Sequence, residues 1–393
     1  MSRGRRFLLF SNEAVGLGHL RRTIAITARL ARNDPDATSL IVTGSPVQPL
    51  FELPPRVEAL TLPTLMRDTS GAHRSRRLVL EAGEIGRLRG SIARAAALAF
   101  EPDCAVVDRF PLGLEGELEP VLASLRTAGC KLVLGLRDIE DDPARVRRTW
   151  GPDLRRAIRQ LYDLVLVYGP QRPALDAIDC LNLEAHELPA PVVHVGYVSA
   201  SANGSRPDDL PDDYVLATVG GGSDGFSVLA TFLEALQLAP LPCPAVVVTG
   251  PLMPQGQVAR LEALADGPGV RVCRFRPNLE GLIARARAVV CMAGYNTVAE
   301  LMHARKPALL VPRVEPISEQ LLRATELERR GLHDVLHPRD LSPGTMRAAL
   351  ERLLERPEPA FDAEHFHGTE LTADLLAQLA QARGRRPTEP AAA

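Results

Sequence analysis

The sequence predicts an α/β protein built from two doubly wound, Rossmann-like halves that face a central cleft. Short apolar runs bounded by turn residues alternate with longer helical patterns, as in parallel βαβ units. The chain has 393 residues, too many for one ordinary hydrophobic core. A polar, proline-rich stretch at 199–213 separates two series of such units. Ligands of doubly wound sheets bind beyond the carboxyl ends of the strands, so we expect the site in the cleft.

The first half is expected to comprise residues 1–198. Its predicted strands are the short apolar runs Arg6–Phe10, Ser39–Val42, Cys104–Val107, Lys131–Leu134, Leu164–Val167 and Pro191–Val195. Its predicted helices are the amphipathic segments His19–Arg32, Arg76–Ala99, Glu117–Thr127 and Pro143–Gln160. The alternation favours a parallel sheet with helices on its faces.

The second half, residues 214–382, repeats this pattern after the predicted linker at 199–213. Its predicted strands are Tyr214–Thr218, Ala245–Thr249, Val270–Cys273, Ala288–Cys291 and Ala308–Val311. Residues 383–393 are rich in Arg, Pro and Ala, and we expect a disordered tail there.

Composition excludes several classes of protein. A hydrophobic content of 46% and a net charge of −2 indicate a globular protein rather than one that coats nucleic acid. The six cysteines include no Cys-x-x-Cys pair, so we expect reduced thiols and no metal site. The apolar run within Arg3–Phe10 is shorter than an export signal, and no run approaches the ~18–20 residues of a membrane span. We therefore expect a cytoplasmic protein without a transmembrane segment, and leave peripheral attachment to a membrane open.

One segment of the second half points to an anionic ligand. Residues 289–301 predict a buried strand, a turn at Gly294 and a helix that opens at Asn296 or Thr297, with Tyr295 between. The first amides of a helix carry unpaired N–H groups and a partial positive charge, which favour phosphate. Glu300 follows one turn later, where a carboxylate could accept hydrogen bonds from a diol such as ribose. The combination suggests a sugar nucleotide.

Further loops of the second half are candidates for the same ligand, although each also has an ordinary structural interpretation. The turn at 218–225 contains Gly221, Gly222 and Ser223, and glycines let backbone amides approach an anion, but structural turns use glycine as often. Phe275 and Arg276 follow a strand and could edge a base. Glu319 and Gln320 could bond sugar hydroxyls, or simply begin a helix, where Glu is favoured.

The first half contributes a Gly-x-Gly-His turn directly after its first strand. Gly16 and Gly18 permit a tight turn, His19 begins a helix that faces the cleft, and Arg21 follows. Histidine is suited to removing a hydroxyl proton near neutral pH, and a helix N-terminus disfavours imidazolium. The alternative for His19 is a helix cap or packing. Its candidate acidic partners are Asp108 first, then Glu13 and Asp138.

These motifs resemble a known family. Phe275, the helix through Ala284, Ala293–Glu300, Pro312 and Gln320 resemble the donor half of the two-domain (GT-B) glycosyltransferases, and especially family 28, which includes the bacterial enzyme that adds N-acetylglucosamine to the lipid-linked peptidoglycan precursor. The first half is more similar to a poorly characterised group of predicted glycosyltransferases. Its Gly-x-Gly-His turn, with Gly16, Gly18 and Arg21, resembles the acceptor-side loop of the same superfamily, and it also resembles nucleotide-sugar hydrolases of the same fold. The sequence departs from the family at Met292, where relatives often carry Arg.

The resemblance implies that residues 1–198 bind the acceptor and residues 214–382 the nucleotide-sugar donor, and it implies roles for individual residues. Phe275 and Arg276 would hold uracil through backbone atoms, Gly294 to Thr297 would meet the diphosphate, Glu300 the ribose and Gln320 the sugar. The implied activity is an inverting, metal-independent transfer of N-acetylglucosamine or a related hexose from a UDP-sugar to a hydroxyl or amine, with His19 as base. No cofactor is expected, because the UDP-sugar is a co-substrate.

Alternatives remain at this stage. A nucleotide-sugar hydrolase or a 2-epimerase could use the same fold, and so could a protein that binds the sugar nucleotide without turnover. The acceptor is not encoded in any recognisable motif, and a small molecule or a membrane-associated glycan precursor would each suit. The basic segment 67–90 could contact an acidic acceptor or anionic lipid, although a solvated helix face is the more ordinary interpretation.

Overall fold

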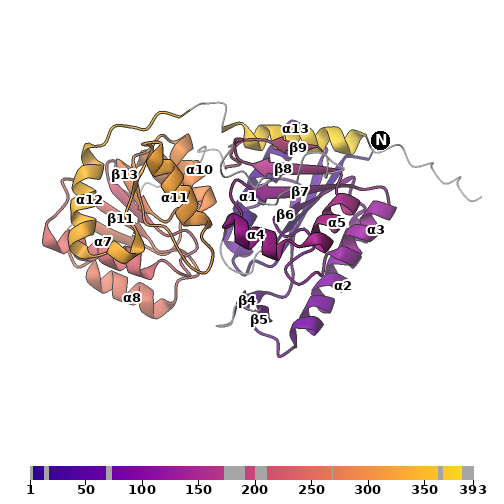
Figure 1. The fold of residues 1–393 in the computed structure, drawn as a ribbon, viewed down its shortest axis with the longest axis horizontal. Coiled ribbons are helices and arrows are strands. Elements are labelled where there is room, and N and C mark those ends of the chain that lie inside the picture. Colours follow the sequence, from indigo (N-terminus) through magenta and orange to yellow (C-terminus); the bar gives the residue numbers. More distant parts are fainter. Residues whose placement is uncertain are drawn as a thin grey trace, which may run out of the picture.

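Two parallel α/β sheets form the molecule, which confirms the predicted fold class. The structure, a computed structural model, describes residues 3–12, 17–67, 73–171, 191–199, 210–267, 269–361 and 366–382. Within these, a seven-stranded and a six-stranded sheet each carry helices on their faces, and the two halves lie next to each other (Figure 1).

The sheet of the first half has the order β3-β2-β1-β6-β7-β8-β9, and all its pairings are parallel. Its strands are β1 Arg6–Ser11, β2 Thr38–Thr43, β3 Val57–Thr61, β6 Cys104–Asp108, β7 Lys131–Arg137, β8 Leu164–Tyr168 and β9 Val192–His194. Its helices are α1 Gly18–Asn33, α2 Ala82–Phe100, α3 Glu119–Thr127, α4 Pro143–Thr149 and α5 Pro152–Leu161. Helices cover both faces of such a sheet, so its central strands are apolar almost throughout.

The sheet of the second half has the order β12-β11-β10-β13-β14-β15, again with parallel pairings. Its strands are β10 Val215–Thr218, β11 Ala245–Val248, β12 Val270–Cys273, β13 Ala288–Cys291, β14 Ala308–Leu310 and β15 Asp334–Val335. The helices that follow β9 in the described chain are α7 Phe226–Leu238, α8 Gln255–Leu264, α9 Leu279–Arg285, α10 Tyr295–His303, α11 Glu319–Arg329, α12 Pro343–Glu355 and α13 Gly368–Gln381. Short 3₁₀ turns occur at Gln48–Leu50 and Pro338–Asp340.

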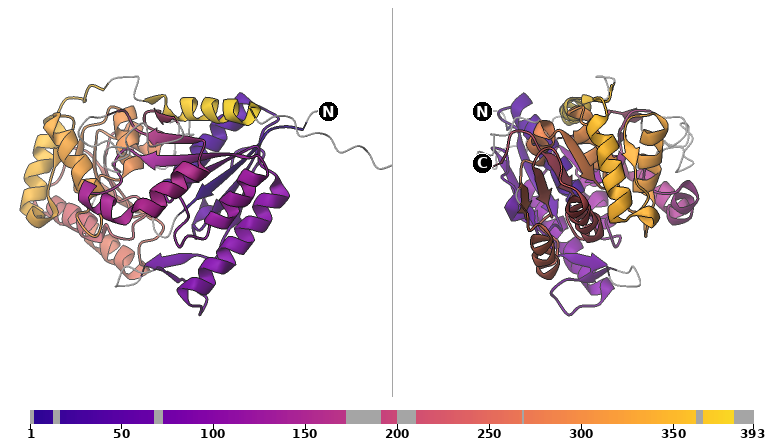
Figure 2. Two further views of the ribbon diagram at one scale, coloured as in Figure 1. Left: turned by 45° about the vertical axis from the view of Figure 1, so that its right-hand side comes forward. Right: turned by 90° about the vertical axis from the view of Figure 1, so that its left-hand side faces the viewer.

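Two predicted helices of the first half differ from the expectation. The segment predicted as a helix from Arg76 begins at Ala82, because Glu81 and Glu84 form a capping box there. The antiparallel hairpin of β4 Leu65–Arg67 and β5 His73–Ser75 precedes it and projects beyond the sheet (Figure 2). The helix predicted over Pro143–Gln160 is divided into α4 and α5 because Pro152 starts a new helix and disfavours helical backbone in Gly151 before it.

The last described helix, α13, returns to the first half, where it packs against α1 (Figure 1). A Cβ at Gly368 would come within 2.5 Å of the carbonyl oxygen of Tyr197, so only glycine permits this close approach. Thr369 Oγ1 donates to the carbonyl of Ser199 over 2.9 Å. This placement differs from the expected extent of the second half, 214–382. Most of the predicted linker, at 200–209, and the predicted tail, 383–393, lie outside the described residues.

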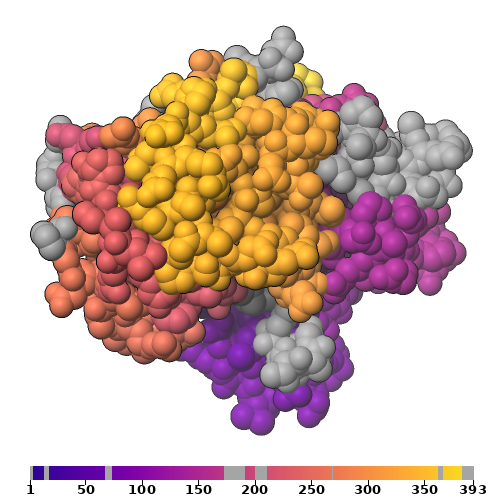
Figure 3. Space-filling view, turned by 60° about the vertical axis from the view of Figure 1, so that its left-hand side comes forward, coloured from indigo at the N-terminus to yellow at the C-terminus, as the bar shows by residue number. Residues whose placement is uncertain are grey.

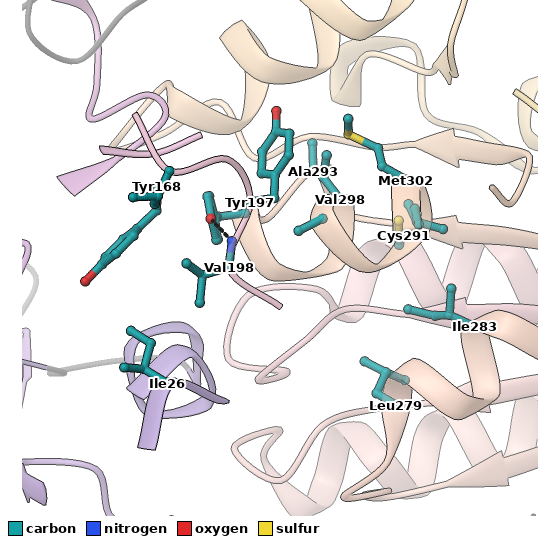
Figure 4. Close-up of a cluster of buried hydrophobic side chains, with 14 of the residues drawn as sticks. Ile26, Tyr168, Tyr197, Val198, Leu279, Ile283, Cys291, Ala293, Val298 and Met302 are labelled. Atoms are coloured by element: carbon teal, nitrogen blue, oxygen red, sulfur yellow. Dashed lines mark hydrogen bonds between the residues drawn. The ribbon is translucent and has the colours of Figure 1, made fainter. Parts of the chain in front are cut away.

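The two halves share buried contacts. Figure 4 shows an apolar cluster in which Ile26 and Tyr168 of the first half belong with Ile283 and Cys291 of the second. In the space-filling view the orange segment around residues 310–330 borders the magenta segment around 140–160 (Figure 3). There, Ser318 donates from its backbone and its hydroxyl to one carboxylate oxygen of Asp141, over 2.9 and 3.0 Å.

One polar contact between the halves is fully buried. Arg323 of α11 donates to both carboxylate oxygens of Asp138, which follows β7, over 2.7 and 3.0 Å. The same guanidinium donates to the carbonyl of Ala293 over 2.9 Å. A bidentate pair of this kind fixes orientation as well as distance. It therefore sets how the carboxyl ends of the two sheets face each other.

Replacing Arg323 by Met is expected to lower the free energy of unfolding by about 3–5 kcal/mol, because the carboxylate of Asp138 stays buried without its partner. Chemical denaturation followed by circular dichroism measures the change. The matched control is Arg156→Met, which removes an exposed pair with Asp153 at 3.2 Å and should cost less than about 1 kcal/mol. Equal effects of the two variants would contradict the assigned role of the buried pair.

Candidate active site

A cavity of about 490 Å³ lies between the two halves, at the carboxyl ends of their strands. Most of the predicted site residues line it: Gly18, His19, Arg21, Gly221, Ser223, Phe275, Arg276, Gly294, Tyr295, Asn296, Thr297, Glu319 and Gln320. Asp108, Gly222 and Glu300 stand behind this wall, and Gly16 lies outside the described residues. The cleft expected from the sequence is therefore where the predicted residues meet.

His19 and Asp108 are in direct contact. Strands β1 and β6 are paired so that Ser11 lies opposite Asp108, and α1 begins soon after β1. This places His19 in the first turn of α1 over the end of β6, with Nδ1 2.9 Å from Oδ1 of Asp108. Asp138, another candidate partner, is bound to Arg323 instead. The third candidate, Glu13, lies outside the described residues.

The surroundings keep His19 neutral. Burial lowers its pKa below the usual 6.5; Asp108 opposes this effect, and the charges of Arg22 and Arg137 add to it. Burial tends to raise the pKa of Asp108, but Arg22 and His19 together hold it well below its usual range. Asp108 is therefore an anion that accepts from Nδ1–H of a neutral imidazole. That tautomer leaves the lone pair of Nε2 available to take a proton.

Helix α10 faces this pair from the second half. It begins at Tyr295, one residue earlier than expected, with Gly294 as its N-cap residue. A Cβ at Gly294 would meet nothing within 4 Å, which shows that the space beside this residue, at the helix N-terminus, is open. The side chain of Asn296 donates to the carbonyl of Gly18 over 3.0 Å and links α10 to α1. The backbone amides of the first turn stay at the cavity, where an anion would be stabilised.

Glu300 is buried one turn further along α10. Its Oε1 lies 2.5 Å from Nη2 of Arg21, which also contacts Glu280 at 3.1 Å. Burial raises the pKa of Glu300 to about 7; Arg21 opposes the rise, and Glu280 adds to it. Its second oxygen, Oε2, has no hydrogen-bond partner among the described residues. Arg21, expected on the acceptor side, thus contacts the carboxylate expected to meet ribose.

The glycine-rich turn after β10 packs against the loop after β11. Gly220, Gly222 and Gly250 have φ values of 63°, 86° and 87°, a region that favours glycine. A Cβ at Gly222 would lie 2.1 Å from the carbonyl oxygen of Thr249, so this glycine serves the packing of the two loops. Gly221 and Ser223, by contrast, line the cavity.

The residues predicted to bind the sugar are held by Arg313, which follows β14. Its backbone N–H donates to Oε1 of Gln320 over 3.0 Å. Its guanidinium donates to Asp224 over 2.9 Å and to Glu319 over 3.1 Å. Burial tends to raise the pKa of Glu319, but Arg137 and Arg313 together lower it below its usual value. Glu319 is therefore ionised and tied to the glycine-rich turn through Arg313.

Several site residues escaped the sequence analysis. Cations at the cavity wall include Arg22, Arg109, Arg137 and Arg313, although Met292 stands where a cation was expected from the resemblance. Arginine is common throughout the chain, so no local pattern distinguishes these residues. Phe51 packs edge-on against Phe275 with ring centroids 5.5 Å apart, which brings the first half to the predicted base-binding loop. Arg109, Arg137 and Arg313 lie at or just after the ends of strands, and only that position could have suggested them.

Two further properties concern the described part of the chain. None of its groups of His, Cys, Asp and Glu has an arrangement that could hold a metal ion. None of its helices is both long and apolar enough to span a bilayer.

Comparison with known proteins supports the family resemblance. Residues 216–378 match the glycosyltransferase family 28 C-terminal domain. A UDP-N-acetylglucosamine–N-acetylmuramyl-(pentapeptide) pyrophosphoryl-undecaprenol N-acetylglucosamine transferase of Rhizobium johnstonii is 32% identical over 35% of this chain and 36% of its own length. An uncharacterised glycosyltransferase of Methanopyrus kandleri is 27% identical over 56% of this chain and 62% of its own. The chain thus spans less than two thirds of both relatives.

Solved structures share the whole architecture at low identity. The glycosyltransferase of kitacinnamycin superposes with a TM-score of 0.63 at 16% identity, covering 96% of this chain and all of that one. A Listeria monocytogenes protein assigned as a UDP-N-acetylglucosamine 2-epimerase gives a TM-score of 0.62 at 12% identity, covering 99% of this chain and all of that one. At such identities the likeness shows the fold alone. This chain therefore has the GT-B glycosyltransferase fold and carries a glycosyltransferase family 28 C-terminal domain in its second half.

Proposed function

We propose that this protein is an inverting glycosyltransferase that uses a nucleotide-sugar donor, with UDP as the nucleotide and N-acetylglucosamine or a related hexose as the sugar. One observation carries the proposal: the His19–Asp108 pair of the first half and the N-terminus of α10 in the second half face the same cavity. A base and an anion-binding helix end on opposite sides of a cleft suit transfer from a diphosphate.

In the proposed reaction, Nε2 of His19 accepts the proton of an acceptor hydroxyl or amine. The acceptor atom forms a bond to the anomeric carbon while the bond from that carbon to the diphosphate oxygen breaks. The electron pair leaves with the nucleoside diphosphate, whose charge the first-turn amides of α10 and the loop at Gly221 would stabilise. Asp108 keeps Nδ1–H in place and stabilises the imidazolium that forms.

The donor subsite would be formed by the second half. Phe275 and Arg276 would edge the base, and Glu300 would accept hydrogen bonds from the ribose hydroxyls. Its Oε2 is buried and has no partner among the described residues, which supports a ligand at this carboxylate. Glu319 and Gln320 would contact the sugar from the far side of the cavity.

A 2-epimerase is the second candidate, because the fold is shared with the protein assigned that activity. A hydrolase would release the nucleotide without an acceptor, a 2-epimerase would return a sugar nucleotide inverted at one ring carbon, and a transferase requires an acceptor. The acceptor would be a small molecule or a membrane-associated glycan precursor.

Binding of the donor tests the proposal first. Calorimetry and thermal shift against UDP, GDP, dTDP and their common sugars, without metal and then with magnesium, should show binding of a UDP-sugar. Glu300→Ala should weaken it by about 10²-fold or more, because two hydrogen bonds to a charged group are lost. Glu351→Ala, an exposed residue of α12, serves as the control. Failure of every nucleotide to bind would remove the donor-site assignment.

The affinity for the donor should rise with pH through about 7. Glu300, whose pKa is raised to about 7 by burial, is a carboxylate above that pH and a weaker acceptor below it. Calorimetry with UDP-N-acetylglucosamine between pH 5.5 and 8.5 measures the effect, since this diphosphate diester does not itself titrate there. In Glu300→Gln the pH dependence should disappear. The same slope in both proteins would assign it to another group.

Substitution of the base should separate binding from transfer. His19→Gln is expected to bind the donor like the parent protein but to transfer sugar about 10²–10⁴-fold more slowly. Mass spectrometry of nucleotide release, with and without an acceptor extract, measures both steps. Release in buffer alone by the parent protein would favour the hydrolase, and conversion of the donor to its C2 epimer with the nucleotide still attached would favour the epimerase. Unchanged transfer by His19→Gln would exclude His19 as the base.

A further inference from the structure

Arg22, which follows Arg21 in helix α1, makes an unusual set of contacts. Its side chain is only 1% exposed. Nε lies 2.9 Å from Oδ2 of Asp108, and Nη2 lies 2.7 Å from Oδ1 of the same carboxylate. Oδ1 is also the atom that contacts Nδ1 of His19, and Nη2 comes within 3.4 Å of that nitrogen. Arg22 therefore touches both members of the candidate catalytic pair.

The guanidinium of Arg22 lies between two tyrosine rings that come from different halves. Its Cζ is 5.1 Å from the ring centroid of Tyr168, at the end of β8, and 4.9 Å from that of Tyr295, the first residue of α10. Gly135 makes room for the first ring, since a Cβ there would lie 2.1 Å from its phenolic oxygen. The hydroxyl of Tyr295 accepts a hydrogen bond from the backbone of Val198 over 3.0 Å.

We propose that Arg22 is a positioning residue for the transfer reaction: it holds Asp108 and His19 so that Nε2 of His19 can accept a proton. Because the ring of Tyr295 comes from the second half, this arrangement also depends on the second half being packed in place against the first. The proposal rests on the proposed function, because it assigns Arg22 a task only if His19 is the base. In this assignment Arg22 acts through Asp108 and takes no proton itself.

The charges around His19 explain why the contact of Arg22 with Asp108 matters for the base. The groups that face it are Asp108 from β6, Arg22 from α1 and Arg137 at the end of β7, together with the uncharged ring of Phe110. An unneutralised carboxylate beside the imidazole would favour imidazolium, which cannot act as a base. With Arg22 bound to both oxygens, Asp108 still accepts from Nδ1–H, and the charge of Arg22 offsets part of the effect by which this carboxylate raises the pKa of His19.

The contacts of Arg22 itself are incomplete. Its Nη1 is buried and has no hydrogen-bond partner among the described residues. A buried guanidinium with an unsatisfied donor costs stability, and cation–π contacts with two rings offset this only in part. An arginine placed for stability alone would be expected to satisfy all its donors. The arrangement is better explained by the fixed geometry that it gives to Asp108.

Ring ¹⁵N chemical shifts of histidine in the full-length protein, without donor or acceptor, test the proposal. His19→Gln assigns the resonance by its disappearance. In the parent protein His19 should carry its proton on Nδ1 and titrate below 6.5. In Arg22→Met the midpoint should rise by about 1 pH unit or more, because the carboxylate of Asp108 is no longer neutralised. Arg22→Lys, which keeps the charge but not the bidentate contact, should lie between the two.

A pair of variants at Tyr295 provides the matched control. Tyr295→Leu removes the ring from Arg22 and should raise the midpoint of His19 in the same direction by a smaller amount. Tyr295→Phe keeps the ring, loses only the bond with Val198, and should leave the midpoint unchanged. Methyl proton spectra establish that each variant is folded. If Arg22→Met does not fold, Arg22→Lys and the two Tyr295 variants decide whether Arg22 controls the titration of His19.

An unchanged midpoint and tautomer in folded Arg22→Met would give Arg22 a purely structural role and overturn the proposal. Equal shifts in the two Tyr295 variants would overturn the part played by the second half. The titration needs no substrate, so its outcome is independent of whether sugar transfer is found. Absence of transfer together with the expected shifts would reject the proposed function and keep the control of His19 by Arg22.

Discussion

The buried pairing of charges between the halves is the constraint on which the rest of the structure depends. Each half is a complete α/β sheet, and nothing in a sheet itself dictates how a second one must face it. Arg323 and Asp138 do, because either charge left buried without its partner would cost several kcal/mol. Once this pair is formed, the carboxyl ends of both sheets border one cavity, and α1 meets α10. The candidate site therefore belongs to neither half alone.

Periodicity predicted the sheets well because their central strands are continuous apolar runs between turns, as at Cys104–Asp108. Periodicity failed where elements are very short, and where a capping residue or a proline determines the residue at which a helix begins. The strands of the β4–β5 hairpin have three residues each, too few for a pattern. The start of α2 depends on Glu81 and Glu84, and the break before α5 on Pro152. The return of α13 to the first half leaves no local signal at all.

The residues of the candidate site also fall into those that the sequence could indicate and those that it could not. His19, Asp108 and the residues of α10 could be proposed from the sequence because they follow strands whose ends meet at one edge. The contact between His19 and Asp108 follows from the register of β1 with β6. Arg22 and Arg313 could not be chosen, because an arginine in the core and a solvated one look alike in a chain so rich in arginine. Their partners include carboxylates far away in sequence, Asp108 for Arg22 and Asp224 for Arg313, which only the folded chain brings to them.

The return of α13 has a mechanical consequence. Ser199, which follows the last strand of the first half, and Thr369, in the first turn of α13, are hydrogen-bonded to each other. The described chain on either side of the second half is therefore fastened at one place on the first half. The buried pair of Arg323 and Asp138 joins the halves at a second place. Separating the two walls of the cavity would have to disturb both fastenings, so the alignment of the walls does not rest on a single contact.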